Sequence, residues 1–241
     1  KGIAVTILGI ISTPGLSYIT KNNGFSYGIM ITASHNPASD NGIKIFSKTG
    51  FKLDPESEKK IENKINNGNI SINSFSKKKI SSGLNMVDNY VLHIKKTYPF
   101  DSLKRKYLID CSNGSNSKIC EKLFSDVNNI TLINDNPNGH NINLDCGALE
   151  SERLHSNTLE KGCDFGVAFD GDGDRIIFCH KDYGFIDTEK IISLFAKYSA
   201  SNGNIQKTVV STHISNMGLK ENLSEIGFEL IETELGDRIV V

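Results

Sequence analysis

The 241-residue sequence has no tryptophan, no surplus of either charge and no long hydrophobic run. No apolar segment approaches the roughly 20 residues of a membrane-spanning helix, so the sequence predicts no membrane partner. Lys and Arg together number 27, and Asp and Glu number 28, which gives a net charge of −1. This balance argues against a nucleic-acid partner, because such binding depends largely on positive charge.

Paired cysteines are also missing. No two of the five cysteines are separated by two residues, which argues against a zinc site or a thioredoxin-type redox motif. An odd number of cysteines in a chain of this length disfavours a secreted disulfide framework. We therefore expect free thiols and a cytoplasmic protein. The cysteines are Cys111, Cys120, Cys146, Cys163 and Cys179.

Short apolar runs alternate with helical patterns from the N-terminus onward. Strands are predicted at Ile3–Leu8 and Tyr27–Thr32, with a helix at Pro14–Asn22 between them and Thr13 as its N-cap. A strand, a helix and a strand in this order predict parallel pairing of the two strands. Because the chain begins with Lys1 rather than Met, we expect that an N-terminal portion precedes it.

A hairpin and a charged helix follow. Ile43–Phe46 and Phe51–Leu53 are predicted to be the hairpin strands, and Asp54–Asn66 the helix. The polar stretch Asn66–Ser82 predicts the first domain boundary.

Two further alternating units follow this boundary. The sequence thus predicts an α/β protein made of tandem small domains with mixed or parallel sheets. We expect the domains at residues 1–80, 81–179 and 180–241, the first and the last being incomplete. The predicted later strands are Tyr107–Asp110, Ile130–Ile133, Phe165–Phe169, Ile176–Cys179, Thr208–Ser211 and Glu229–Glu232. The predicted later helices are Leu84–Thr97, Lys118–Phe124, Ser151–Lys161, Thr188–Ser199 and Met217–Ile226.

Three carboxylates alternate with glycine directly after one predicted strand, in the run Asp170-Gly171-Asp172-Gly173-Asp174-Arg175. In an extended chain these carboxylates would lie about 6.6 Å apart, too far to share a small cation bound at about 2.1 Å, so the chain must curl. Carboxylates about 4 Å apart repel by about 4 kcal/mol at an effective dielectric constant near 20, and a cation would relieve this repulsion. The all-oxygen set favours Mg²⁺.

Two other interpretations of this run are an EF-hand and a solvated acidic turn. An EF-hand needs glycine at its sixth position and an acidic residue at its twelfth. This sequence has Arg175 and Lys181 there, which excludes an EF-hand. The acidic turn stays open, although the carboxyl end of a strand is where sites lie in α/β proteins.

The second motif, Thr32-Ala33-Ser34-His35-Asn36-Pro37, also follows a predicted strand. His35 is poorly placed to act as a base for Ser34, because neighbours in an extended chain point to opposite sides. By itself this stretch is equally compatible with an ordinary turn.

Together the two motifs resemble the phosphoserine loop and the metal loop of the α-D-phosphohexomutases. The resemblance covers nearly the whole chain and implies the central part of a four-domain protein around a cleft. Further matching runs are Asn41–Lys44, Pro137–Asn143, Cys146–Ala148, Ser215–Leu219 and Gly236–Arg238.

The resemblance implies a role for each candidate residue. Ser34 would carry a phosphoryl group, and Asp170, Asp172 and Asp174 would hold Mg²⁺ together with a phosphate oxygen on Ser34. Lys44 would assist proton transfer, and its pKa would be lowered by the cations beside it. Arg175 would pair with phosphate, and His35 would orient the loop or contact phosphate. Gly236, Asp237 and Arg238 would bind the sugar.

The implied activity is a sugar-phosphate isomerisation through a phosphoserine and a sugar bisphosphate. The sequence is most similar to the branch acting on glucosamine phosphates, which feeds UDP-N-acetylglucosamine synthesis. The alternatives are action on mannose or glucose phosphates, or a non-catalytic Mg²⁺-binding fragment. We expect the 241-residue chain to be inactive by itself, and the sequence leaves a homodimer open.

Overall fold

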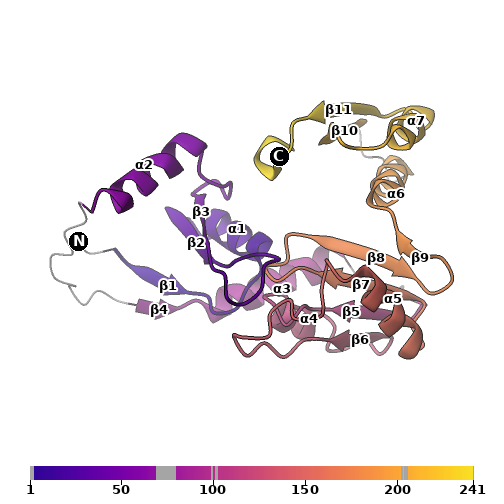
Figure 1. The fold of residues 1–241 in the computed structure, drawn as a ribbon, viewed down its shortest axis with the longest axis horizontal. Coiled ribbons are helices and arrows are strands. Elements are labelled where there is room, and N and C mark those ends of the chain that lie inside the picture. The colour runs from indigo at the N-terminus through magenta and orange to yellow at the C-terminus, as the bar shows by residue number, and fades with distance from the viewer. Residues whose placement is uncertain are drawn as a thin grey trace.

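The computed structural model describes residues 3–68, 80–98, 100, 103–201, 203 and 206–240, and only the backbone of residues 237 and 238. It shows an N-terminal unit (β1 to β4), a central unit (α3 to β9) and a C-terminal unit (α6 to α8) (Figure 1). The predicted architecture of tandem α/β units with mixed or parallel sheets is confirmed. Among the described residues, no helix is long and apolar enough to cross a membrane.

The N-terminal unit contains two separate strand pairs. The parallel pairing predicted for its first two strands is wrong. Strand β1 pairs in parallel with β4, whereas β2 pairs in antiparallel fashion with β3. An apolar run predicts a strand but not its partner, because the backbone groups that form the ladder are the same in every residue. The elements are β1 (Val5–Ile7), α1 (Thr13–Asn22), β2 (Tyr27–Ile31), β3 (Ile43–Ser47), α2 (Pro55–Asn66) and β4 (Ile80–Ser82).

Helix α1 begins one residue earlier than predicted. Its N-cap is Ser12, whose hydroxyl accepts a hydrogen bond from the backbone N–H of Gly15 at 3.3 Å. Thr13 is the first helical residue, so its assignment as the cap is wrong. Because Ser12 caps the helix, the hydroxyl of Thr13 is available for another partner.

The predicted hairpin is confirmed by a bridge between Phe46 and Lys52. Asp54 caps α2 by accepting a hydrogen bond from the N–H of Ser57 at 2.8 Å. The predicted boundary segment Asn66–Ser82 lies largely outside the described residues.

The central unit is built on one five-stranded mixed sheet in the order β6-β5-β7-β8-β9. The first three strands are parallel and the last two antiparallel. The short strand β9 was not predicted. The elements are α3 (Leu84–Thr97), β5 (Tyr107–Asp110), α4 (Ser117–Leu123), β6 (Ile130–Ile133), α5 (Ser151–Glu160), β7 (Phe165–Phe169), β8 (Ile176–His180) and β9 (Gly184–Ile186).

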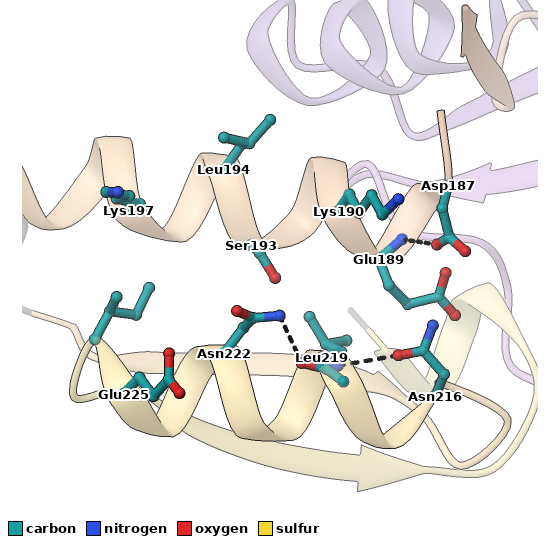
Figure 2. Close-up of a pocket in the computed structure, with 12 residues that line it drawn as sticks. Asp187, Glu189, Lys190, Ser193, Leu194, Lys197, Asn216, Leu219, Asn222 and Glu225 are labelled. Carbon is teal, nitrogen blue, oxygen red and sulfur yellow. Dashed lines mark hydrogen bonds between the residues drawn. The ribbon is translucent and has the colours of Figure 1, made fainter. Parts of the chain in front are cut away.

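The C-terminal unit contains the predicted parallel pair, β10 with β11. A pocket of about 530 Å³ lies between its helices α6 and α7, and Ser193, Asn216 and Asn222 are among its lining residues (Figure 2). The elements are α6 (Thr188–Ser201), β10 (Thr208–Thr212), α7 (Met217–Glu225), β11 (Glu229–Thr233) and α8 (Asp237–Val240).

One hydrophobic core joins the N-terminal and central units. Leu16 and Ile19 of α1 belong to the same buried cluster as Val87 of α3 and Ile119 of α4. Burying such side chains stabilises a contact by about 1.5–3 kcal/mol each, so the two units are held together by packing. The five cysteines are free, as expected, and all of them are buried.

Candidate active site

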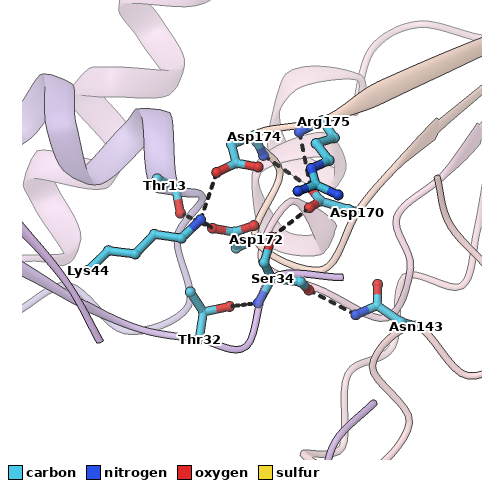
Figure 3. Close-up of polar contacts among 9 residues, drawn as sticks. All are labelled: Thr13, Thr32, Ser34, Lys44, Asn143, Asp170, Asp172, Asp174 and Arg175. Atoms are coloured by element: carbon cyan, nitrogen blue, oxygen red, sulfur yellow. Dashed lines mark hydrogen bonds and ion pairs between the residues drawn. The ribbon is translucent and has the colours of Figure 1, made fainter. Parts of the chain in front are cut away.

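Two loops from different units meet at one place (Figure 3). The serine loop (residues 32–42) joins β2 to β3, and the aspartate loop (residues 170–175) joins β7 to β8. The hydroxyl of Ser34 donates a hydrogen bond to Oδ2 of Asp170 at 3.0 Å. The two sequence motifs are therefore adjacent in space.

The serine loop holds Ser34 in an unusual backbone conformation. Its φ is 58°, in the left-handed region that a residue with a side chain rarely adopts. The hydroxyl of Thr32 accepts a hydrogen bond from the N–H of Ser34 at 3.0 Å, and the N–H of Thr32 donates to the carbonyl of Gly42 at 2.9 Å. These bonds close the loop at both ends and present Ser34 at its tip.

The aspartate loop has the curl that the spacing of its carboxylates predicted. Oδ1 of Asp170 accepts hydrogen bonds from the N–H groups of Asp174 and Arg175, both at 3.1 Å. Gly173, with a φ of 72°, donates its N–H to the carbonyl of Asp170 at 3.0 Å. One carboxylate oxygen from each aspartate lies within 4.8 Å of the others.

Lys44 forms ion pairs with two of these carboxylates. Its Nζ lies 2.5 Å from Oδ2 of Asp172 and 2.7 Å from Oδ2 of Asp174. Burial lowers the pKa of Lys44, but hydrogen bonds to these two carboxylates outweigh burial and raise it. This direction holds for the ion-paired arrangement without a bound cation, whereas the lowered pKa of Lys44 beside Mg²⁺ stays a prediction.

Asp170 and Asp172 are both 1% exposed but differ electrostatically. Burial and the neighbouring charge of Asp172 raise the pKa of Asp170. Burial also disfavours the charge on Asp172, but hydrogen bonds from Lys44 and Thr13 outweigh it and lower the pKa of that carboxyl. Asp172 is thus held as a carboxylate.

The three aspartates fit a small divalent cation. Oδ2 of Asp172 accepts hydrogen bonds from Lys44 and Thr13, whereas its buried Oδ1 has no hydrogen-bond partner in the described structure. A buried carboxylate oxygen without a partner is costly, and a cation would satisfy it. An all-oxygen donor set suits Mg²⁺ better than zinc.

The other predicted site residues, apart from the serine, the lysine and the three aspartates, have few side-chain contacts in the described structure. Arg175 is exposed and contacts Asp170 through its backbone N–H. His35 is half-buried, and its Nδ1 has no hydrogen-bond partner in the described structure. Gly236 is exposed, with a φ of 139°, directly before α8. The side chains of Asp237 and Arg238 lie outside the described residues.

Two residues at the site were missed by sequence reasoning. Thr13 donates both its hydroxyl and its backbone N–H to Asp172, the latter at 2.8 Å. Asn143 donates its side-chain amide to the carbonyls of Ser34 and Asn36, both at 2.9 Å. Asn143 lies in a run that matches the family, which was the available signal; Thr13 was instead assigned to helix capping.

A serine and an aspartate cluster at the junction of tandem α/β units define a phosphohexomutase-type protein, and comparison with known proteins agrees. Three family models match the chain: phosphoglucomutase/phosphomannomutase α/β/α domain I at residues 1–70, domain II at 88–184 and domain III at 187–241. The chain belongs to this phosphohexomutase family, whose members are isomerases.

Two similar curated relatives share one name, phosphoglucosamine mutase. The chain is 40% identical to the phosphoglucosamine mutase of Geobacillus thermodenitrificans, covering 100% of this chain and 55% of that protein. It is 39% identical to the phosphoglucosamine mutase of Listeria monocytogenes, covering 100% and 54%. The chain thus spans about half the length of these relatives.

Among solved structures, a phosphoglucomutase/phosphomannomutase family protein from Burkholderia thailandensis matches with a TM-score of 0.80 at 22% identity. The match covers 99% of this chain and 53% of that one. At this identity the match supports the fold alone.

Proposed function

We propose that this chain carries the phosphoserine and metal-binding part of a phosphoglucosamine mutase, which interconverts glucosamine 6-phosphate and glucosamine 1-phosphate. The observation that carries the proposal is the contact between the Ser34 hydroxyl and Asp170 at 3.0 Å, inside a cluster of three aspartates. The choice of glucosamine rests on the relatives of that name. Action on mannose or glucose phosphates is the second candidate, because the matching family models bear those names.

We propose a division of labour among three domains. Residues 1–80 would present Ser34, residues 81–179 would hold the metal, and residues 180–241 would contact the sugar through Gly236, Asp237 and Arg238. Asp170, Asp172 and Asp174 would bind Mg²⁺. When bound, Mg²⁺ would supply positive charge that stabilises the oxygen of Ser34 as a leaving group.

The proposed reaction begins with a phosphoryl group on Ser34. The bond between its Oγ and phosphorus breaks as a sugar hydroxyl bonds to phosphorus, and the proton that leaves the sugar hydroxyl is balanced by one gained at the Oγ of Ser34. The resulting sugar bisphosphate turns over in the cleft and returns its other phosphoryl group to Ser34. Such transfer depends mainly on positioning and charge stabilisation, which the charged groups around Ser34 would supply.

Three side chains around Ser34 have supporting roles in this proposal. Lys44 would assist proton transfer at Ser34, because its ammonium lies among the same carboxylates. Arg175 would pair with a phosphate through its planar guanidinium. His35 would contact phosphate, which would also satisfy its unpartnered Nδ1.

The test is the substrate preference of the full-length protein. Conversion of glucosamine, glucose and mannose 6-phosphates to the 1-phosphates would be followed by phosphorus NMR. We expect glucosamine 6-phosphate to give the largest kcat/KM. A larger value for mannose or glucose phosphate would overturn the assignment to glucosamine. The 241-residue chain is expected to show no turnover, because its active relatives are nearly twice as long.

A further inference from the structure

Two side chains cross between the N-terminal and central units in opposite directions. Thr13, at the start of α1 in the N-terminal unit, donates to Asp172 of the aspartate loop. Asn143, in the central unit, donates to the carbonyls of Ser34 and Asn36 in the serine loop. Each unit thereby holds the reactive loop of the other (Figure 3).

We propose that Thr13 and Asn143 are positioning residues that form a reciprocal clamp, which keeps the Ser34 hydroxyl beside the aspartates. The clamp deepens the proposed function and rests on it, because it assigns these residues to the geometry of the same site. Neither side chain needs to touch the substrate. Thr13 holds Asp172 through its hydrogen bonds, and Asn143 holds the backbone of the serine loop.

The amide of Asn143 matches its two partners. Both partners are backbone carbonyls, which only accept hydrogen bonds, so the NH₂ group must face them and uses both of its donors. Asn143 is itself fixed, because its own N–H donates to the carbonyl of Ser112 at 2.9 Å. Its φ of 55° lies in the left-handed region, which asparagine tolerates better than most residues.

The backbone conformation of Ser34 explains why the serine loop needs hydrogen bonds from another unit. A residue with a side chain at a φ of 58° is strained by about 1–3 kcal/mol and persists only where its surroundings fix it. Asn143 bonds to the carbonyl of Ser34 itself and to the carbonyl two residues later. The strained tip of the loop is therefore held from outside its own unit.

Thr13 acts on the opposite side of the site. It is 5% exposed, and its N–H and hydroxyl both donate to one residue, Asp172. The hydroxyl bonds to Oδ2 and leaves Oδ1 free, so the carboxylate is oriented with one oxygen available to a cation. A residue that hydrogen-bonds to a metal ligand without touching the metal fixes the orientation of that ligand. Removing such a residue typically lowers metal affinity by about 10–100-fold.

The test uses the full-length protein with one variant on each side of the clamp. Asn143→Asp keeps the shape of the side chain and its tolerance of positive φ. It replaces the NH₂ group, which donates to two carbonyls, with a carboxylate oxygen that cannot donate. Thr13→Val keeps the branched shape and removes the hydroxyl, whereas Thr13→Ser keeps the hydroxyl.

Two matched controls accompany these variants. Asn138→Asp lies in the same loop as Asn143, and its side-chain oxygen accepts from the N–H of His140, which aspartate preserves. The second control is Thr20→Val. Thr20 lies in the same helix as Thr13 and is also buried, but its hydroxyl bonds to the carbonyl of Leu16 within the helix.

Three readouts are measured: amide hydrogen exchange of residues 32–42, calorimetric Mg²⁺ affinity, and the separate values of kcat and KM. For Asn143→Asp we expect faster exchange in the serine loop and a fall in kcat of about tenfold or more, with KM changed less. For Thr13→Val we expect Mg²⁺ affinity to fall about tenfold or more, with recovery in Thr13→Ser. Controls are expected to match the wild type.

The clamp is overturned if both variants match their controls in exchange and Mg²⁺ affinity while the wild type is active. Should Asn143→Asp fail to fold, Asn143→Gly removes both donors, permits the same φ and serves in its place. If the wild type lacks mutase activity but the exchange and affinity changes occur, the proposed function fails and the clamp stands.

Discussion

The hydroxyl oxygen of Ser34 lies 3.0 Å from a carboxylate oxygen of Asp170, although the two residues are 136 positions apart in the chain. One follows strand β2 and the other follows β7, in sheets that share no strand. They meet because helices α1, α3 and α4 pack into one hydrophobic cluster. The position of the site is therefore set by helix packing between units and not by either sheet alone.

Replacing Ser34 with alanine should abolish the phosphorylated form of the protein. Ser34→Ala removes the only atom that the proposal makes a phosphoryl carrier, while a methyl group still fits the loop. The measurement is intact mass and peptide mapping of full-length protein incubated with glucosamine 1,6-bisphosphate. Ser39→Ala is the control, because Ser39 is exposed in the same loop and its hydroxyl donates to the neighbouring Asp40. Phosphate found on another residue of Ser34→Ala would contradict the assignment.

Replacing Asp172 with asparagine should severely weaken Mg²⁺ binding. The substitution removes one charge from the cation site and also the ion pair with Lys44. Calorimetry should show an affinity loss of at least about tenfold, equivalent to about 1.4 kcal/mol. Asp182→Asn, at an exposed turn, should bind Mg²⁺ as the wild type does. Unchanged affinity in Asp172→Asn would count against the aspartate loop as the metal site.

Replacing Lys44 with methionine should make the fold more dependent on a divalent cation. The ammonium of Lys44 neutralises Asp172 and Asp174, and without it these carboxylates repel each other and Asp170. In the absence of divalent ions we expect a loss of about 2 kcal/mol in the free energy of unfolding, the size of a charged hydrogen bond.

Denaturant unfolding with and without Mg²⁺ measures this effect. Mg²⁺ should stabilise Lys44→Met more than it stabilises the wild type, because the cation takes over the role of the ammonium. Lys48→Met, on the exposed turn of the same hairpin, should differ little from the wild type. Equal stabilisation of Lys44→Met and the wild type by Mg²⁺ would show that Lys44 does not balance the cation site.

Local patterns predicted the elements and the two motifs well, because those depend on residues close together in the chain. Strands β5, β6 and β7 have the predicted bounds, and the curl of the aspartate loop follows from its spacing of carboxylates and glycines. The meeting of Ser34 with the aspartates came from the family resemblance. No local pattern contains the packing that brings them together.

The errors in prediction share one physical cause, which is that a polar group does not reveal a distant partner. The sequence predicts Thr13 as a helix cap because Ser and Thr are common there, but its hydroxyl bonds to Asp172 across 159 positions. No local pattern shows that the ammonium of Lys44 pairs with Asp172 and Asp174, which lie 128 and 130 positions away. Strand β1 was paired with β2 because they are neighbours in sequence, whereas its partner is β4.

Gly171 lies directly against the serine loop, and adding one methyl group there should separate the two loops. A Cβ on Gly171 would lie 2.6 Å from the carbonyl oxygen of Ser34 and 2.8 Å from the amide nitrogen of Asn143. Real Cβ contacts are essentially never below 3.0 Å, and a backbone carbonyl cannot move aside as a flexible side chain can. Gly171→Ala must therefore push the serine loop away from the aspartates.

The effect on function should exceed the effect on stability. Overpacking of this kind costs about 1–3 kcal/mol, which a shift of the loop can reduce, whereas the same shift breaks the contact between Ser34 and Asp170. A displacement of about 1 Å at a reacting group can lower kcat about 100-fold. Gly218→Ala, where the nearest atom would lie at 3.2 Å, is the control. Full phosphorylation of Ser34 and normal turnover in Gly171→Ala would show that the close approach of the loops is not required for transfer.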